Sequence, residues 1–178
     1  MTRAVLSLGS NMGDRAGYLR GAIEALDELV MAVSGVYETA PWGGPGPDGQ
    51  EQPPYLNATV LAVDASDDPY AWLERARELE RAAGRERDAA WRFAPRTLDV
   101  DVIAVWEADG AAVISDDPEY VLPHPRAHER AFVLRPWLDI QPYAQLPGHG
   151  WVYDLVRAPP VAADLPGLRP CADLSLEP

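Results

Sequence analysis

The sequence of 178 residues contains no lysine, so all fifteen of its basic residues are arginines. This excludes a P-loop kinase, whose phosphate-binding loop needs a lysine before its serine or threonine. The single cysteine, Cys171, excludes an internal disulfide and fits a reducing compartment. No run of 18 apolar residues is present, and the first apolar run is too short for a secretory signal. The sequence therefore predicts a cytoplasmic protein.

Acidic residues outnumber basic ones by 28 to 15, and the formal net charge is −13. A chain this acidic would repel a phosphate backbone, so neither nucleic acid nor a membrane surface is an expected partner. Histidine occurs three times, and no cysteine lies near His124, whose only neighbouring histidine is His128, so the local sequence lacks the ligand set of a zinc site. Cys171 lies in a Pro-rich tail, and no Ser-His-Asp or Cys-His arrangement is evident.

Seven of the fifteen arginines fall within one segment of 22 residues: Arg75, Arg77, Arg81, Arg85, Arg87, Arg92 and Arg96. Such a concentration in an acidic chain indicates a local anion. The alternative is a solvated helix face on which glutamates pair with arginines at helical spacing. That alternative accounts for the first arginines of the segment but not for those beyond Gly84.

Hydrophobic periodicity gives the expected order of elements. Strands are expected at 3–9, 33–39, 55–63 and 98–106, and helices at 14–32, 69–83 and 127–140. Irregular stretches separate them at 41–54 and 85–97, and Asp109-Gly110 is typical of a hairpin turn. The 41–54 loop is long enough to indicate a function beyond connection.

The order β-α-β-β-α-β predicts an α+β fold with a ferredoxin-like core. We expect a mainly antiparallel sheet with helices packed on one face, followed by a C-terminal extension. Residues 1–178 would form a single domain. The tail, 148–178, is expected to wrap the surface with one short helical turn.

The strongest local signal is the run Pro95-Arg96-Thr97-Leu98-Asp99-Val100-Asp101-Val102. Strand alternation places Asp99 and Asp101 on one face, with their Cα atoms about 6.5–7 Å apart. Paired carboxylates suit Mg²⁺, which completes its shell with water and substrate phosphates. Two solvated aspartates on an exposed face are the alternative. The loop arginines before them fit either structural ion pairing or phosphoryl transfer.

A second cluster is typical of a site for an aromatic ligand. Tyr55 and Asn57 share one face of their strand, next to the loop that carries Thr39 and Trp42. Asparagine offers a donor and an acceptor to the edge of a heterocycle, and aromatic rings offer stacking faces. Ordinary packing is the alternative for each aromatic residue, and Phe132 is a core residue by default.

Several motifs in order give the chain a resemblance to the 6-hydroxymethyl-7,8-dihydropterin pyrophosphokinase family. The segments that carry it are Leu8–Asn11, Tyr37–Thr39, Tyr55–Asn57, Glu80 with Gly84–Arg87, Phe93–Asp101, Leu122–Pro125 and Arg130–Pro136. The resemblance implies transfer of diphosphate from ATP to the hydroxymethyl group of the pterin, with release of AMP, in folate biosynthesis. It also implies two Mg²⁺ ions, ATP and a reduced pterin as small-molecule substrates, and a monomer.

The resemblance also implies roles for individual residues. Asp99 and Asp101 would be the metal ligands. They would form the catalytic set together with Arg85, Arg87 and Arg96. The ATP-binding residues implied are Arg77, Glu80, Arg87, Phe93, Arg96, Val102, His124 and Arg130. The pterin-binding residues implied are Thr39, Ala40, Trp42, Tyr55, Asn57 and Phe132.

The chain departs from the family pattern at some of these positions. Ala40 replaces the usual proline, Trp42 a small aliphatic residue, Arg77 a glutamine and Pro125 an aromatic residue. The loop before Arg96 is one residue longer than the common form, which affects the assignment of Arg92 and Phe93. Two rival functions remain: a nucleotidyltransferase, which would release pyrophosphate, and a non-catalytic binding module.

Overall fold

A computed structural model describes residues 1–41, 45, 49–85 and 94–176. The first half of these contains β1 (Thr2–Ser10), α1 (Arg15–Leu26), η1 (Asp27–Leu29), β2 (Val30–Val33), β3 (Tyr37–Thr39), β4 (Tyr55–Asp64) and α2 (Ala71–Ala82). Next come β5 (Asp99–Glu107), β6 (Ser115–Asp117), β7 (Tyr120–Leu122), η2 (Ala127–Glu129) and α3 (Ala131–Ile140). The C-terminal part contains β8 (Gln145–Leu146), β9 (Gly150–Trp151), α4 (Val152–Arg157), α5 (Val161–Asp164), η3 (Leu165–Gly167) and β10 (Arg169–Pro170).

The main sheet has the strand order β10-β3-β4-β1-β5, and β2 also pairs with β4. Every one of these pairings is antiparallel. β4 occupies the middle, because its ten residues pair with β1 along one side and with β2 and β3 along the other. The predicted α+β fold with an antiparallel sheet, packed helices and a C-terminal extension is therefore confirmed.

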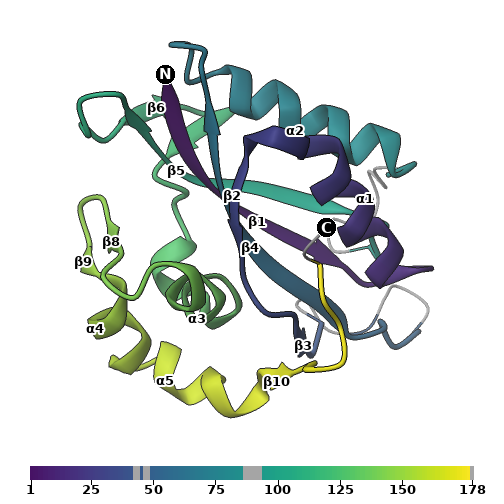
Figure 1. Cartoon of the computed structure of the whole chain (residues 1–178). Coiled ribbons are helices and arrows are strands. Elements are labelled where there is room, and N and C mark those ends of the chain that lie inside the picture. The colour runs from purple at the N-terminus through teal and green to yellow at the C-terminus, as the bar shows by residue number, and fades with distance from the viewer. Residues whose placement is uncertain (42–44, 46–48, 86–93, 177–178) are drawn as a thin grey trace.

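Helices cover both faces of this sheet, so the prediction of helices on one face is wrong (Figure 1). Alternate residues of β1 show the division. Ala4, Leu6 and Leu8 pack in the core under α1 and α2, whereas Val5 packs in a second core with Leu134 of α3. The second core also takes apolar side chains from α4 and α5, which the expected single helical turn of the tail did not include.

Two expected elements end differently from the prediction. The helix expected at 14–32 stops at Leu26, because Asp27 adopts a left-handed φ of 47° and Val30 then pairs with Ala62 in the sheet. The strand expected at 33–39 is two strands, because residues 34–36 oppose only two residues of β4. Ser34 fills the gap by accepting a 2.8 Å hydrogen bond from the backbone N–H of Thr59.

The remaining predicted elements are close to those observed. α2 lies within the expected helix and is followed by Gly84 at φ 68°. The last main helix, α3, begins later than expected, since Arg130 has an extended backbone between η2 and α3. Gly110 at φ 87° forms the predicted turn after β5. Of the helices in the described ranges, none has the length and apolar character needed to cross a membrane.

Candidate active site

A cavity of about 270 Å³ opens at one end of the sheet, on the face that also carries α3. Its floor consists of alternate residues from three neighbouring strands: Ser7 and Gly9 of β1, Tyr55 and Asn57 of β4, and Asp99 and Asp101 of β5. Strand register explains their proximity, since Gly9 pairs with both Asn57 and Asp99, and Ser7 pairs with Asp101. The antiparallel pairing therefore brings residues about 45 to 90 positions apart into one row.

Gly9 keeps the floor of the cavity open between Asn57 and Asp99. A Cβ atom at this position would lie 3.4 Å from the Tyr55 ring and 3.5 Å from Asn57 Oδ1. Such a methyl group fits sterically, but it would stand in the space that separates the aromatic side of the cavity from the acidic side. The motif Leu8–Asn11 thus places a glycine in the floor of the site, where the lack of a side chain leaves space for a ligand.

Two guanidinium groups hold Asp99. Arg85 Nη1 donates to Asp99 Oδ1 over 2.7 Å, and Arg96 Nη1 donates to Asp99 Oδ2 over 2.8 Å. Arg85 is also held by the carboxylate of Glu80, which is buried and accepts the N–H of Val100 at 3.0 Å. Both oxygens of Asp99 therefore have charge-assisted hydrogen bonds from arginines of the predicted anion-binding segment.

Asp101 faces the same cavity with a different set of partners. Arg130 Nη1 donates to Asp101 Oδ2 over 2.8 Å, and His124 Nε2 lies 3.7 Å from the same oxygen. Burial and the neighbouring charge of Asp99 raise the pKa of the Asp101 carboxyl, although Arg130 opposes the shift. A further cation in the cavity would favour the ionised form.

His124 is positioned by its own backbone and by the next residues. Its N–H donates to the carbonyl of Ile103 in β5, and its Nδ1 accepts the backbone N–H of Arg126 at 3.2 Å. With Nδ1 as an acceptor, the proton of a neutral ring lies on Nε2, the atom nearest Asp101. Burial lowers the pKa of His124, so the ring favours this neutral form.

Asn57 and Thr39 form the polar wall of the opposite side of the cavity. Asn57 Nδ2 donates to Thr39 Oγ1 over 2.8 Å, and both side chains are buried. The half-buried Tyr55 lines the same region, where desolvation raises the pKa of its hydroxyl. Phe132, at the start of α3, lies under the Arg130 guanidinium at 5.5 Å. The polar and aromatic pair predicted from the sequence thus meets the paired aspartates in one cavity.

Sequence reasoning did not assign Asn11, which joins two loops at the edge of the site. Its Oδ1 accepts the N–H of Arg96 at 2.7 Å, and its Nδ2 donates to Gln52 Oε1 and to the carbonyl of Pro53. Asn11 is fully buried. Its presence in the motif Leu8–Asn11 is a signal in the sequence, but its partners lie 41 to 85 residues away.

Ser7, Gly9 and Arg126 also line the cavity and were not predicted. Ser7 could have been found from strand alternation, because it lies two residues before Gly9 on the face opposite the Leu6 and Leu8 side chains. Arg126 follows the His124 loop without any local pattern that marks it.

Other predicted residues lie around the cavity rather than in its lining. Glu80 is a buried anchor for Arg85, and Arg77 pairs with Glu74 and Glu119 at the surface. Ala40 lies beside a second hollow with Pro41. Trp42, Arg87, Arg92 and Phe93 fall outside the described residues.

Val102 lines a neighbouring hollow of about 260 Å³ together with Leu73, Val121 and Pro125. This hollow shares Asp101 and His124 with the main cavity. It therefore offers a space of mixed lining, with aliphatic side chains on part of its wall, directly beside the charged end of the main cavity.

The acidic pair has the chemistry of a site for a hard divalent cation. Among the described residues no three histidine, cysteine or acidic side chains gather to enclose a metal. Asp99 and Asp101 supply two carboxylates on one wall of an open cavity, which matches the one or two carboxylates that Mg²⁺ takes from a protein when phosphates complete its shell. The donor set therefore fits Mg²⁺ bound together with a phosphate ligand.

Comparison with known proteins adds independent evidence. A family model described as 7,8-dihydro-6-hydroxymethylpterin-pyrophosphokinase (HPPK) matches residues 5–142. The chain is 46% identical over 150 residues to a protein of Mycobacterium tuberculosis named 2-amino-4-hydroxy-6-hydroxymethyldihydropteridine pyrophosphokinase, covering 82% of this chain and 76% of that protein. The protein of the same name from Mycobacterium leprae is 50% identical over 151 residues, covering 82% and 75%.

Solved structures show the same fold at low sequence identity. A chain described as HPPK-DHPS in complex with substrates aligns with a TM-score of 0.63 at 11% identity, over 99% of this chain. Wild-type Plasmodium falciparum HPPK-DHPS with pteroate aligns with a TM-score of 0.60 at 13% identity, over 88% of this chain. The present chain spans only 45% and 44% of those two solved chains.

Proposed function

Because the chain belongs to the 7,8-dihydro-6-hydroxymethylpterin-pyrophosphokinase family, we propose that it transfers the diphosphate of ATP to 6-hydroxymethyl-7,8-dihydropterin in folate biosynthesis, releasing AMP. One observation carries the proposal. A single cavity combines two strand carboxylates and their partners Arg96 and Arg130 with a buried amide and two aromatic rings. The first group suits a polyphosphate, and the second suits a pterin.

The pterin would occupy the side of the cavity lined by Asn57 and Thr39. Asn57 donates to Thr39 with its amide nitrogen, and its Oδ1 lies next to the open position above Gly9. A carbonyl oxygen placed there can accept an N–H of a heterocycle. Tyr55 and Phe132 would enclose the ring, and the hydroxymethyl group would then point along the floor toward Asp99.

The nucleotide would approach from the side of β5. Its phosphates would lie between the aspartates and the arginines, while its base would enter the neighbouring hollow and pack against Val102, Val121 and Pro125. His124 and Asp101 line both spaces, so a ligand can extend from one to the other past them. Arg77 and Glu119 would lie at the rim of this second space.

Asp99 and Asp101 would hold Mg²⁺, and we propose two ions. When bound, Mg²⁺ would neutralise the polyphosphate and lower the pKa of the attacking hydroxyl. The arginines that now balance the aspartates would then transfer to the phosphates. Arg85 and Arg130 would exchange a carboxylate for a phosphate oxygen, since bidentate guanidinium groups suit both.

The reaction is an in-line displacement at the β-phosphorus of ATP. The hydroxymethyl oxygen of the pterin forms a bond to this phosphorus, the bond to the oxygen shared with the α-phosphorus breaks, and AMP leaves with the electron pair. The proton of the hydroxyl group goes to solvent. The chain contributes orientation of the two substrates and stabilisation of charge by Arg85, Arg96 and Arg130.

Product analysis tests the proposal directly. The protein is incubated with ATP, Mg²⁺ and the pterin, and the nucleotide product is identified. AMP in a one-to-one ratio with the pterin diphosphate is expected. Pyrophosphate as a product would instead support a nucleotidyltransferase, and no turnover together with pterin binding would support a binding module. Asp99→Asn and Asp101→Asn should each abolish turnover without loss of the fold.

The finer features of the fold are also proposals. We infer that β1, α1, β2, β4, α2 and β5 form a ferredoxin-like βαββαβ core, which the strand order β5-β1-β4-β2 supports. Residues 1–178 would act as one domain, because Leu176 of the tail is buried in the core under α1 and α2. A monomeric state and a cytoplasmic location stay predictions.

A further inference from the structure

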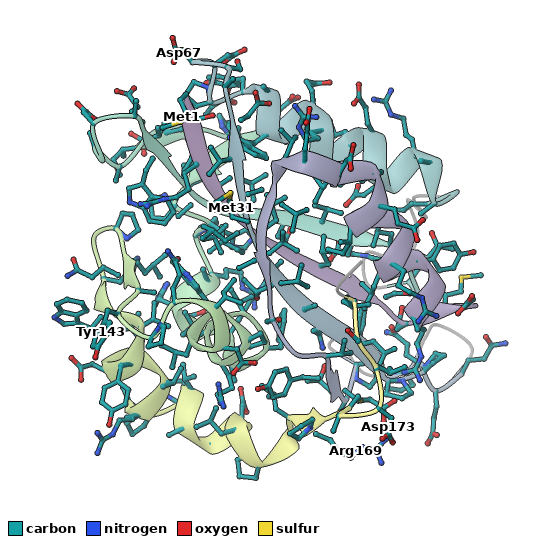
Figure 2. The ribbon with its side chains drawn as sticks, viewed as in Figure 1. Met1, Met31, Asp67, Tyr143, Arg169 and Asp173 are labelled. Atoms are coloured by element: carbon teal, nitrogen blue, oxygen red, sulfur yellow. The ribbon has the colours of Figure 1, made fainter. Side chains whose placement is uncertain are left out.

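The end of the described chain runs along the free edge of β3. β10 pairs antiparallel with β3, with Arg169 opposite Glu38 and Pro170 opposite Tyr37. The next residue continues the contact, because the N–H of Cys171 donates to the carbonyl of Val36 over 2.8 Å. Leu176 then enters the main core at 4% exposure. Residues 169–176 therefore form a strap, which Figure 2 locates by its labelled Arg169 and Asp173.

The strand that pairs with this strap, β3, is short and carries a residue of the side of the cavity proposed to bind the pterin. β3 has three residues, and its last residue, Thr39, accepts the hydrogen bond from Asn57. β3 otherwise pairs only along β4, so the strap supplies the partner for its second edge within the described sheet. An edge strand of this length gains order from a second neighbour.

Glu38 links the strap to both ends of the 41–54 loop. Its carboxylate accepts a 3.0 Å hydrogen bond from Arg15 and a second one from Arg169. Arg15 also donates over 2.7 Å to the carbonyl of Pro54, the residue before β4. Glu38 itself lies three residues before Pro41. One carboxylate therefore connects the entrance of the loop, its exit and the tail.

The tail also forms a wall beside the pterin side of the cavity. A hollow of about 350 Å³ lies between Thr39, Ala40 and Phe132 on one side and Gly167 and Leu168 on the other. Thr39 and Phe132 line the main cavity as well. Movement of the tail would therefore change the surroundings of two residues that face the ligand.

We propose that residues 169–176, acting through Glu38 and β3, are a positioning element for the pterin subsite. They hold Thr39 against Asn57 and fix both ends of the 41–54 loop, while the nucleotide side on β5 stays independent of them. The inference rests on the proposed function, because it names the pterin as the ligand of that side. The family model ends at residue 142, so this element lies outside the part of the chain that it matches.

The experiment compares the full chain with a chain that ends at Leu168. Pterin binding is titrated with Mg²⁺ and α,β-methylene-ATP, nucleotide binding is titrated alone, and steady-state constants are measured for both substrates. We expect Kd and KM for the pterin to rise about tenfold, which corresponds to the loss of one or two hydrogen bonds. We expect kcat and the Kd for the nucleotide to stay within about twofold of the full chain.

Hydrogen exchange supplies a readout that does not depend on activity. Amides of residues 36–39 should exchange faster in the shortened chain, and those at the centre of β1 and β5 should not. Arg169→Ala should give a smaller change in the same direction. Arg157→Ala is the matched control, because this exposed arginine carries the same charge and, within the described part of the chain, its side chain donates a hydrogen bond only to Tyr153.

Three outcomes would overturn the proposal. One is unchanged pterin affinity in a folded shortened chain, another is equal weakening of pterin and nucleotide, and the third is unchanged exchange at residues 36–39. If the shortened chain does not fold, Arg169→Ala and Cys171→Pro decide the question by the same measurements. If the full chain releases no AMP, the proposed function fails, whereas pterin titration and exchange still test the positioning role.

Discussion

Replacing Asn11 by alanine is expected to reduce both stability and activity. The Asn11 side chain is fully buried and makes three hydrogen bonds, to the Arg96 N–H, to Gln52 Oε1 and to the Pro53 carbonyl. Alanine would leave these partners without their present bonds. Two of the three bonds are only partly buried, so water can replace part of what is lost.

The size of the effect follows from these contacts. A buried polar group left unpaired costs about 1–3 kcal/mol, and groups that reach water cost less. We therefore expect a loss of about 2–4 kcal/mol in the free energy of unfolding. For a domain of this length, that loss lowers Tm by about 5–15 °C. Arg96 would keep the hydrogen bond that its carbonyl accepts from the residue-11 N–H but lose the one that its own N–H donates to the side chain. Because Arg96 is then held less firmly, kcat/KM should also fall about 10- to 100-fold.

Thermal unfolding and steady-state kinetics of Asn11→Ala test these values. Gln141→Ala is the control, since it removes one hydrogen bond, from Trp137, at the other end of α3 from Phe132. This control should lose about 1 kcal/mol of stability without a change in kcat/KM. A Tm within 2 °C of the parent, or activity within twofold, would refute the role assigned to Asn11.

Three further changes have expected outcomes. Gly9→Ala should fold with equal or higher Tm, because its Cβ has 3.4 Å of space, yet weaken pterin binding about tenfold by calorimetry; unchanged affinity would contradict the open floor. Thr39→Val should raise KM for the pterin more than KM for ATP, and an equal rise would count against the division of the cavity. Burial and His128 lower the pKa of His149, so its contribution to stability is present above about pH 6.5 and decreases as pH falls. The Tm of His149→Asn should therefore fall less between pH 7 and pH 5 than the Tm of the unsubstituted protein. An equal fall in both proteins would show that His149 does not cause this pH dependence.

The sequence predicted the fold where periodicity and burial agree. β4 and β5 are strongly patterned, and Leu98, Val100 and Val102 are buried on the face opposite Asp99 and Asp101, as expected. The prediction of helices on only one face of the sheet failed, because both faces of the central strands are buried. Val5, Thr59 and Ile103 contact the helices on the second face, but polar neighbours interrupt the apolar pattern there.

The site was predictable as two clusters, and its assembly was not. Strand alternation places Asp99 beside Asp101 and Tyr55 beside Asn57. The pairing of β1 with both β4 and β5 is what joins the clusters, and it depends on a register that the sequence does not display. Asn11 was missed for the same reason, since its partners are remote along the chain. The roles of all these residues stay predictions.

The arginines that hold Asp99 and Asp101 have a consequence for the sequence of binding events. Each carboxylate already has a guanidinium counter-ion, so a bare divalent cation would have to displace an existing ion pair and leave the arginine without compensation. A cation that arrives on a triphosphate brings anionic oxygens to which the same arginines can transfer. In the proposed reaction, the charge of this cavity would thus favour loading of metal and nucleotide as one unit, before the pterin binds.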